Sequence, residues 1–226
     1  MYLLSTRSLR HYYSRMTAAV FELRRYALHP GSRNPFIELF EREFIEPQEA
    51  LGMTLAGLFC DADDVNRFIW LRGFEDMHAR RAALAAFYGG CVWQTHRDAA
   101  NAAMIDSDDV FLLRAIDVQG LDGSSVRRPL LCVAYLFDSS ERLRAFHKHY
   151  VSEIAPRLKD AGVALIAAFE TEPSANDFPA LPVRSNDHAF VAFLSGAQRS
   201  DLLWTNPTEI VELIPTARSR LRVTMA

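Results

Sequence analysis

Two kinds of apolar pattern alternate along the first half of the chain. Short runs rich in Val, Phe, Ile, Leu and Trp are typical of β-strands, and apolar residues that recur every three or four positions are typical of amphipathic helices. The pattern predicts strands at 20–28, 54–60, 66–74 and 109–116, and helices at 32–51, 75–88 and 92–103. The resulting order, β-α-β-β-α-β, predicts a ferredoxin-like unit.

The same order of elements repeats after a polar stretch at 120–128. The second half predicts strands at 130–137, 163–171, 188–194 and 209–215, a long helix at 139–161, a proline-rich loop at 172–187 and a short helix at 198–204. Two such units in one chain can bury the sheet surfaces that each would otherwise expose. We therefore expect an α+β fold in which two ferredoxin-like repeats, 17–118 and 129–226, form a one-chain barrel.

Residues 1–16 form a basic segment ahead of the first predicted strand. Arg7, Arg10 and Arg15 lie in this segment together with serines and tyrosines, and without an acidic residue. Such a composition is typical of a transit peptide, but it also fits a start site assigned too early, with Met16 as the functional start, or a disordered tail. We favour the last two interpretations.

Composition limits the classes of protein that the chain can represent. Half of its 226 residues are apolar or aromatic and 23% are charged, with a net charge of -3, which is typical of a globular protein with a large core. The longest apolar runs fall far short of the ~20 residues that a membrane-spanning helix needs. Since basic residues are not in surplus, we expect no nucleic-acid partner. We expect a cytoplasmic protein without a transmembrane segment.

Metal and cofactor signals are weak in this sequence. Cys60, Cys91 and Cys132 lie too far apart to hold structural zinc, and we expect them to be reduced, buried thiols. No group of His, Asp and Glu has the spacing of metal ligands, and the sequence contains no glycine-rich phosphate loop. We therefore expect neither a metal nor a cofactor.

Alternation along the first strand separates a polar face from an apolar face. Glu22, Arg24 and Tyr26 share one face, and Phe21 and Leu23 share the other. We expect the apolar face to pack beneath the helices, which leaves the polar face pointing into the barrel.

Two further strands are expected to line the barrel beside this polar face. The third strand would contribute Trp70 and Arg72, and the second strand would contribute Phe59. Apolar walls with a few charged groups are typical of small-molecule pockets. The alternative is a structural Glu–Arg pair inside a filled barrel, because a buried guanidinium needs an anion. In both cases we expect Arg72 to meet Glu22 or a ligand anion.

A second candidate cluster lies on the predicted helix at 92–103. Trp93, His96 and Arg97 are spaced so that they share one side of that helix. At the mouth of the barrel, Trp93 could stack on a ligand, His96 could act as an acid or base, and Arg97 could hold an anion. The alternative is a tryptophan that anchors the core beside a solvated face.

Several sequence blocks occur in an order that resembles a known family. The blocks are 21–31 (FELRRYALHPG), 56–59 (AGLF), 68–74 (FIWLRGF), 86–90 (AFYGG), 96–101 (HRDAAN) and 108–114 (DDVFLLR). Together they resemble bacterial proteins of the NIPSNAP family over about 20–114, whereas the second half resembles that family only in its order of elements. The resemblance implies a fold of the dimeric α/β-barrel superfamily, which includes small monooxygenases and binding proteins, and it implies a homodimer.

Two functions are the main candidates for these residues, and a purely structural scaffold is a third, weaker one. The first is the binding of a small hydrophobic or aromatic metabolite in the barrel pocket, without catalysis. The alternative is a cofactor-independent, monooxygenase- or isomerase-like enzyme that uses the same pocket, with acid–base and orienting roles for Glu22, Tyr26, Arg72 and His96. No motif in the sequence separates the two.

Overall fold

The computed structural model describes residues 18–118 and 129–221, and it contains every strand that the sequence predicts. The first repeat consists of β1 (Val20–Leu28), α2 (Arg33–Leu39), η1 (Phe40–Phe44), α3 (Ile45–Ala50), β2 (Thr54–Asp61), β3 (Arg67–Phe74), α4 (Met77–Gly89), α5 (Cys91–Ala103), β4 (Met104–Asp106) and β5 (Val110–Val118). The π-helical turn η1 joins α2 and α3 into one continuous helix. The sequence did not predict the short strand β4.

The second repeat follows the same order with fewer helices. It consists of β6 (Leu130–Phe137), α6 (Ser140–His149), η2 (Tyr150–Ile154), α7 (Ala155–Asp160), β7 (Ala164–Thr171), β8 (His188–Ser195), η3 (Arg199–Thr205) and β9 (Glu209–Pro215). The 3-10 helix η3 stands where the first repeat has α4 and α5, which confirms the predicted reduction of the second helix. The predicted basic segment 1–16 and the polar stretch 120–128 lie outside the described residues.

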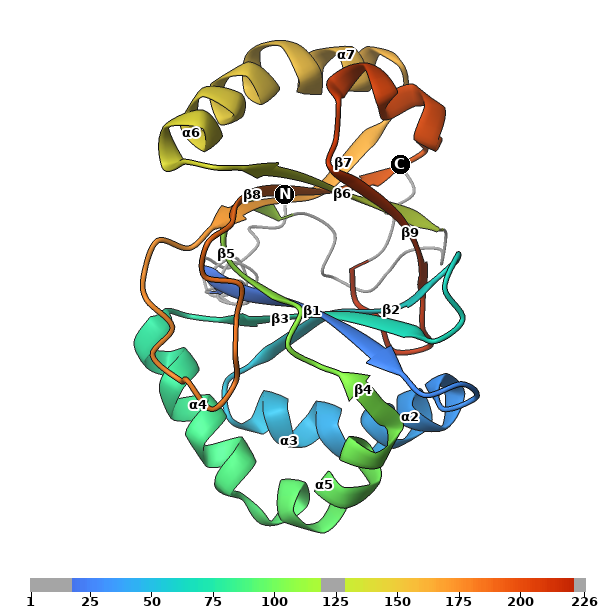
Figure 1. Ribbon diagram of the computed structural model, residues 1–226, viewed down its shortest axis with the longest axis vertical. Coiled ribbons are helices and arrows are strands. Elements are labelled where there is room, and N and C mark those ends of the chain that lie inside the picture. Colours follow the sequence, from blue (N-terminus) through green and yellow to red (C-terminus); the bar gives the residue numbers. More distant parts are fainter. Residues whose placement is uncertain (1–17, 119–128, 222–226) are drawn as a thin grey trace, which may run out of the picture.

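Eight strands close into one antiparallel barrel. Their order around the ring is β3-β2-β9-β6-β8-β7-β5-β1, and β1 closes the ring by pairing with β3, while β4 extends from β1 outside it. The two repeats are joined along their edges, through β2 with β9 and β5 with β7. Figure 1 shows the barrel at the centre, with the helices of each repeat at opposite ends. The predicted one-chain barrel is confirmed.

The barrel interior is a hydrophobic core to which both repeats contribute. Phe21 packs edge-on against Phe169, with ring centroids 5.0 Å apart, and Phe193 lies within 6.1 Å of Phe59 and 5.9 Å of Phe169. All four side chains are fully buried. Because these rings come from opposite repeats, burial inside the barrel stabilises the association of the two halves.

Residues 40–61 and 150–171 carry the same local structure, 110 positions apart. Both ranges begin with a π-helical turn and end with a strand that contains a β-bulge. Gly52 and Gly162 precede those strands with φ of 86° and 79°, a left-handed conformation that favours glycine. The chain therefore contains two copies of one structural repeat.

The three cysteines are not all buried, contrary to the sequence-based expectation. Cys132 lies inside the barrel, where burial raises the pKa of its thiol to about 12. Cys60 is half-buried, and burial raises its pKa as well. Cys91 is exposed because it begins α5, directly after the paired glycines that end α4. Within the described ranges, no helix has both the length and the apolar character needed to cross a membrane.

Candidate functional site

The polar face of β1 lies on the opposite side of the sheet from the one that the sequence analysis assigned. Glu22, Arg24 and Tyr26 do share a face, but that face packs beneath the helices of the first repeat, while Phe21 and Leu23 point into the barrel. This reversal of the two faces has a physical cause. Both faces of this sheet are buried, so the alternation of polar and apolar residues separates the faces without showing which one meets the helices.

The same inversion applies to β3. Trp70 and Arg72 lie on the helix side, and Ile69 and Leu71 fill the barrel. Phe59 lies inside the barrel as predicted, but for this reason it is separated by the sheet from the other candidate residues. The predicted barrel pocket is therefore wrong, and most of its residues come together on the other side of the sheet.

Three arginines converge on the carboxylate of Glu22. Arg72 donates from Nε (2.9 Å) and Nη2 (2.7 Å) to Glu22 Oε2, and Arg24 donates from Nη1 to the same oxygen at 2.9 Å. Arg80, from α4, donates from Nε to Glu22 Oε1 at 2.7 Å. All four side chains are at most 1% exposed. The predicted pairing of Arg72 with Glu22 is confirmed, within a larger cluster.

The charges in this cluster hold Glu22 ionised. Burial alone would raise the pKa of Glu22, but the attraction of Arg72, Arg24 and Arg80 outweighs burial and holds that pKa far below its usual range. The pKa of Tyr26 is raised, first by burial, although Arg24 opposes the shift. At neutral pH the cluster therefore contains an anionic glutamate and a neutral tyrosine.

Further contacts involve other donors of the three arginines. Gln48 Oε1 accepts from Arg72 Nη1 at 3.0 Å, and the Tyr26 hydroxyl accepts from Arg24 Nε at 3.0 Å. Arg80 Nη1 donates to Asp177 Oδ1 at 2.7 Å and to Asn176 Oδ1 at 3.1 Å. The three guanidinium groups thus face one fully buried carboxylate, with a second one, Asp177, at the edge of the cluster.

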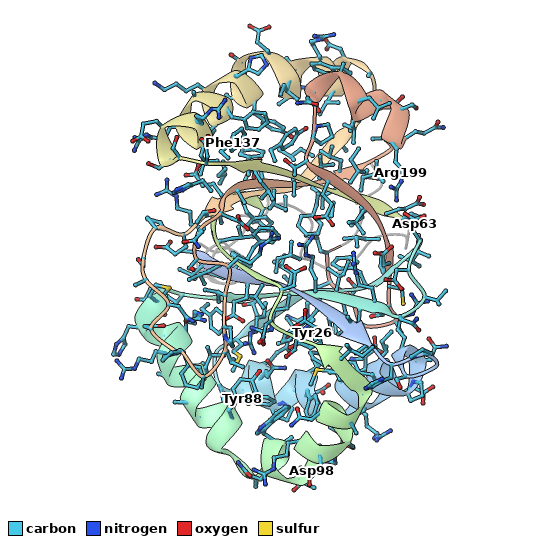
Figure 2. The ribbon with its side chains drawn as sticks, in the orientation of Figure 1. Tyr26, Asp63, Tyr88, Asp98, Phe137 and Arg199 are labelled. Atoms are coloured by element: carbon cyan, nitrogen blue, oxygen red, sulfur yellow. The ribbon has the colours of Figure 1, made fainter. Side chains whose placement is uncertain are left out.

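Aromatic rings surround the arginine cluster. The guanidinium of Arg72 lies 4.9 Å from the ring centre of Trp70, 5.6 Å from that of Phe74 and 5.9 Å from that of Tyr88. Cation–π attraction therefore adds to the ion pairs. The indole Nε1 of Trp70 is buried and has no hydrogen-bond partner in the described part of the chain. Figure 2 labels Tyr26 and Tyr88, both on the helix side of the first repeat.

A loop of the second repeat covers the cluster. The segment between β7 and β8 reaches across the molecule to α4, as Figure 1 shows. It brings Asn176 and Asp177 onto Arg80, and the Phe178 ring stacks on Tyr88 with centroids 6.3 Å apart and 28° between the planes. The first repeat supplies the cluster and the second repeat supplies its cover.

The second predicted cluster does not lie at the mouth of the barrel. Its residues belong to α5, in the outer helical layer. Trp93 is half-buried against Phe44 and Tyr88, and His96 Nε2 lies 3.4 Å from Glu43 Oε2. Arg97 is exposed beside Asp98. The interpretation of Trp93 as a core anchor beside a solvated face describes these positions better.

Sequence reasoning missed Arg80, Tyr88 and the residues of the covering loop. For Arg80 a signal existed, because the buried positions of α4 are Arg80, Ala83, Leu84 and Phe87. This spacing places an arginine on the apolar stripe of the helix, and a charge there needs a partner. Asp177 carries no local signal, since it meets Arg80 from 97 positions away.

The second repeat builds the corresponding layer mostly from apolar side chains, with one buried carboxylate, Glu170 on β7, which contacts Arg114 and His147. The helix-facing side chains of β6 are Leu131, Val133 and Tyr135, and β8 adds Phe190, Ala192 and Leu194. In the described part of the second repeat, this layer therefore has no buried arginine, and the arginine that pairs with Glu170 is half-exposed.

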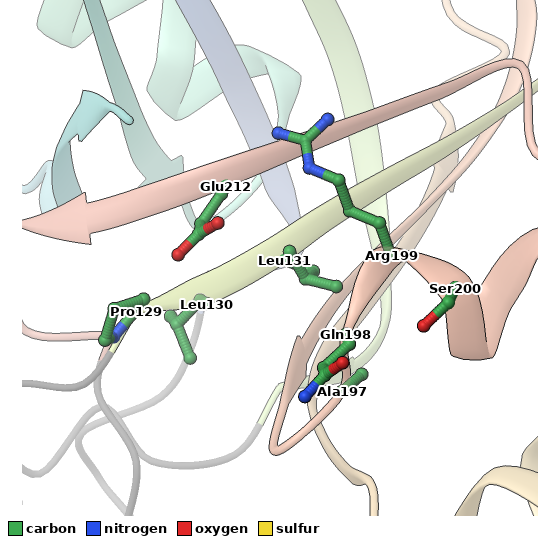
Figure 3. A pocket seen from close by; sticks show the side chains of 8 residues that line it. All are labelled: Pro129, Leu130, Leu131, Ala197, Gln198, Arg199, Ser200 and Glu212. Carbon is green, nitrogen blue, oxygen red and sulfur yellow. The ribbon is translucent and has the colours of Figure 1, made fainter. Parts of the chain in front are cut away.

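Two surface hollows also lie on the second repeat. One, of about 390 Å³, is lined by residues that include Leu131, Arg199 and Glu212 (Figure 3). The other, of about 830 Å³, lies against Tyr150 and Leu165. Neither contains a residue that the sequence singled out. Among the described residues, no group of His, Cys, Asp and Glu is arranged to hold a metal ion.

Solved structures place the fold in a known class. A proposed monooxygenase from Fusobacterium nucleatum is 7% identical, and 88% of this chain covers 94% of that chain with a TM-score of 0.59. A proposed monooxygenase from Lactobacillus acidophilus is 11% identical, with the same shares covered and a TM-score of 0.54. These similarities define a tandem dimeric α/β-barrel fold.

The match to a known family model lies in the first repeat. Residues 21–118, which lie in the first repeat, match the NIPSNAP family model, so this repeat is similar to NIPSNAP domains. An uncharacterized NIPSNAP-like domain protein from Burkholderia xenovorans is 26% identical over 43% of this chain and 84% of that chain, with a TM-score of 0.39. A comparison with curated proteins found no significant match.

Replacing Glu22 is expected to destabilise the protein more than replacing Arg72. Glu22→Gln leaves three buried guanidinium groups without their shared anion, and we expect a loss of about 3–5 kcal/mol in the free energy of unfolding. Arg72→Leu leaves Glu22 paired with Arg24 and Arg80 and should cost less. Urea unfolding of both variants at pH 7 measures the difference, and equal losses would contradict the shared role of Glu22.

The stability gained from Glu22 should disappear in acid. Its pKa is lowered in the folded state, so its contribution is complete above the unfolded value of about 4.3 and is lost as the pH falls below it. We expect the stability difference between the wild type and Glu22→Gln to shrink between pH 6 and pH 3. Urea midpoints across this range measure it, and a constant difference would show that Glu22 is not ionised in the fold.

Proposed function

We propose that the first repeat binds a small hydrophobic or aromatic metabolite, without catalysis, between its sheet and α4. The binding residues would be those that the sequence singled out on β1 and β3, together with two from α4. They are Glu22, Arg24, Tyr26, Trp70, Arg72, Arg80 and Tyr88. This site takes the place of the barrel pocket, which the phenylalanine core fills.

The comparison between the two repeats carries this proposal. Burying ionised groups costs desolvation energy, and buried ion networks can often be replaced by apolar residues without loss of stability. Among its described residues, the second repeat has a mostly apolar layer at the corresponding place, with Glu170 as a buried carboxylate and no buried arginine. Since the second repeat folds without buried arginines there, the three arginines of the first repeat are best explained by recognition of a ligand.

The aromatic surroundings favour a ligand with an apolar body. Trp70 and Tyr88 present rings to the cluster, and the buried Nε1 of Trp70 is a free donor in the described structure. Apolar walls with a few fixed polar groups are typical of sites that orient small molecules.

Catalysis is less well supported than binding. A general base works best with a pKa near neutrality, and the pKa of Glu22 is far below that. His96 is placed beside Glu43 rather than among the arginines. The likeness to proposed monooxygenases shows the fold alone. The homodimer implied by the family resemblance also stays a prediction, for which sedimentation is the test.

The test is the identification of what the full chain retains during purification. Protein purified from cells is denatured, and the released small molecules are measured by mass spectrometry. We expect one hydrophobic or aromatic compound to be enriched with the wild type and reduced at least tenfold with Arg80→Lys, which keeps the charge but loses the guanidinium fork.

Arg81→Lys is the matched control, because Arg81 is the exposed neighbour of Arg80 on α4. It should retain as much compound as the wild type. Circular dichroism confirms that each variant is folded. Equal retention by Arg80→Lys, or no enriched compound in any sample, would contradict the proposal.

A further inference from the structure

The loop that covers the arginine cluster presents a carboxylate and an aromatic ring side by side. Asp177 Oδ1 lies 2.7 Å from Arg80 Nη1, and the neighbouring Phe178 stacks on Tyr88. We propose that Asn176, Asp177 and Phe178 occupy the place of the ligand, which is therefore an aromatic carboxylate. This inference rests on the function proposed above.

Charge balance selects an anion. The three guanidinium groups face Glu22 and Asp177, and both Glu22 and Arg80 are fully buried. When Asp177 leaves, Arg80 loses its second anion inside a layer that is otherwise aromatic. A neutral ligand would leave that charge uncompensated, which is costly. A carboxylate restores the balance and matches the fork of the guanidinium group.

The ring of Phe178 selects the rest of the ligand. It is half-buried, packs against the core beneath the helices, and lies nearly parallel to Tyr88. Withdrawal of this ring exposes the face of Tyr88, and an aromatic ligand ring would cover it again. The pair Asp177–Phe178 thus resembles an aromatic acid in both its charge and its flat apolar surface.

The loop is built so that its tip can leave while its ends stay in place. At one end Glu172 N donates to Leu112 O at 3.0 Å, and at the other Arg184 N donates to Val110 O at 2.8 Å. The tip has its own internal support, because Asn176 bonds to the backbone of Phe178 and Leu181. When the loop opens, the contacts of its tip with Arg80 and Tyr88 are replaced by contacts of the ligand. Because the closed tip must be displaced first, it lowers the apparent affinity of the protein for the ligand.

The test compares two loop variants with defined probes. The double variant Asp177→Asn/Phe178→Ala removes both mimicking groups, and Ser174→Ala is the control, since Ser174 is exposed and bonds to Glu172 of the same loop. The probes are phenylacetate, its neutral analogue phenylacetamide, and phenyl phosphate. Isothermal titration measures the dissociation constants.

We expect phenylacetate to bind the double variant at least tenfold more tightly than it binds the wild type or Ser174→Ala. Phenylacetamide should bind all three proteins at least tenfold more weakly than phenylacetate. The inference is overturned if phenylacetate binds the double variant no more tightly than the wild type, or if the amide or the phosphate binds as well as the carboxylate.

Hydrogen exchange of the loop amides in the wild type is an independent test of opening that needs no variant. The amide of Phe178 donates to Asn176 Oδ1, which Arg80 also holds in the closed state, and the amide of Leu181 donates to Phe178 O. Once the tip leaves Arg80 and the Tyr88 ring, these bonds lose that support, so saturating phenylacetate should speed their exchange. Unchanged exchange with bound phenylacetate would overturn the mimicry. Retention of a neutral or phosphorylated compound by the purified protein would overturn the ligand class alone, whereas retention of nothing would overturn the proposed function as well.

Discussion

The carboxylate of Glu22 is the point on which the helix side of the first repeat depends. The sheet places Glu22 directly opposite Arg72 on the neighbouring strand, and strand geometry brings Arg24 onto the same face two residues later. The third arginine, Arg80, comes from α4, so the ion pairs also fasten that helix to the sheet. Through Arg80 the same cluster holds the loop of the second repeat. One buried anion therefore connects strand pairing, helix packing and the cover of the candidate site.

Comparison of the two repeats distinguishes the features that the fold requires from those that only the first repeat has. Both repeats have the same strand order, the same π-helical turn and the same bulged strand, yet among the described residues only the first has buried arginines gathered around a carboxylate between sheet and helices. The barrel itself is held by apolar rings from both repeats, on the other side of the sheet. The charged cluster can therefore serve binding while the stability of the barrel depends on packing.

Much of this arrangement could be predicted from the sequence. Apolar periodicity predicted the strands and the two repeats, and the cost of burying an unpaired guanidinium predicted the pairing of Arg72 with Glu22. Which face of the sheet meets the helices could not be predicted, because Glu22 and Phe21 are equally buried. Alternation separates the two faces but does not show which one lies beneath the helices. Arg80 could have been found on the apolar stripe of α4. Asp177 could not, because only the folded chain brings its loop from the second repeat to the first.

The most direct test is to give the first repeat an apolar layer in place of its charged cluster. In the variant Glu22→Leu/Arg24→Met/Arg72→Met/Arg80→Met, the ionised groups are replaced together by apolar side chains of similar length. If the charges serve recognition, urea unfolding at pH 7 should give a free energy equal to or above that of the wild type, because the replacement leaves no fully buried charge unpaired and Asp177 is partly exposed. The copurifying compound should be lost. A folded variant that still retains the compound, or a chain that no longer folds, would contradict the account.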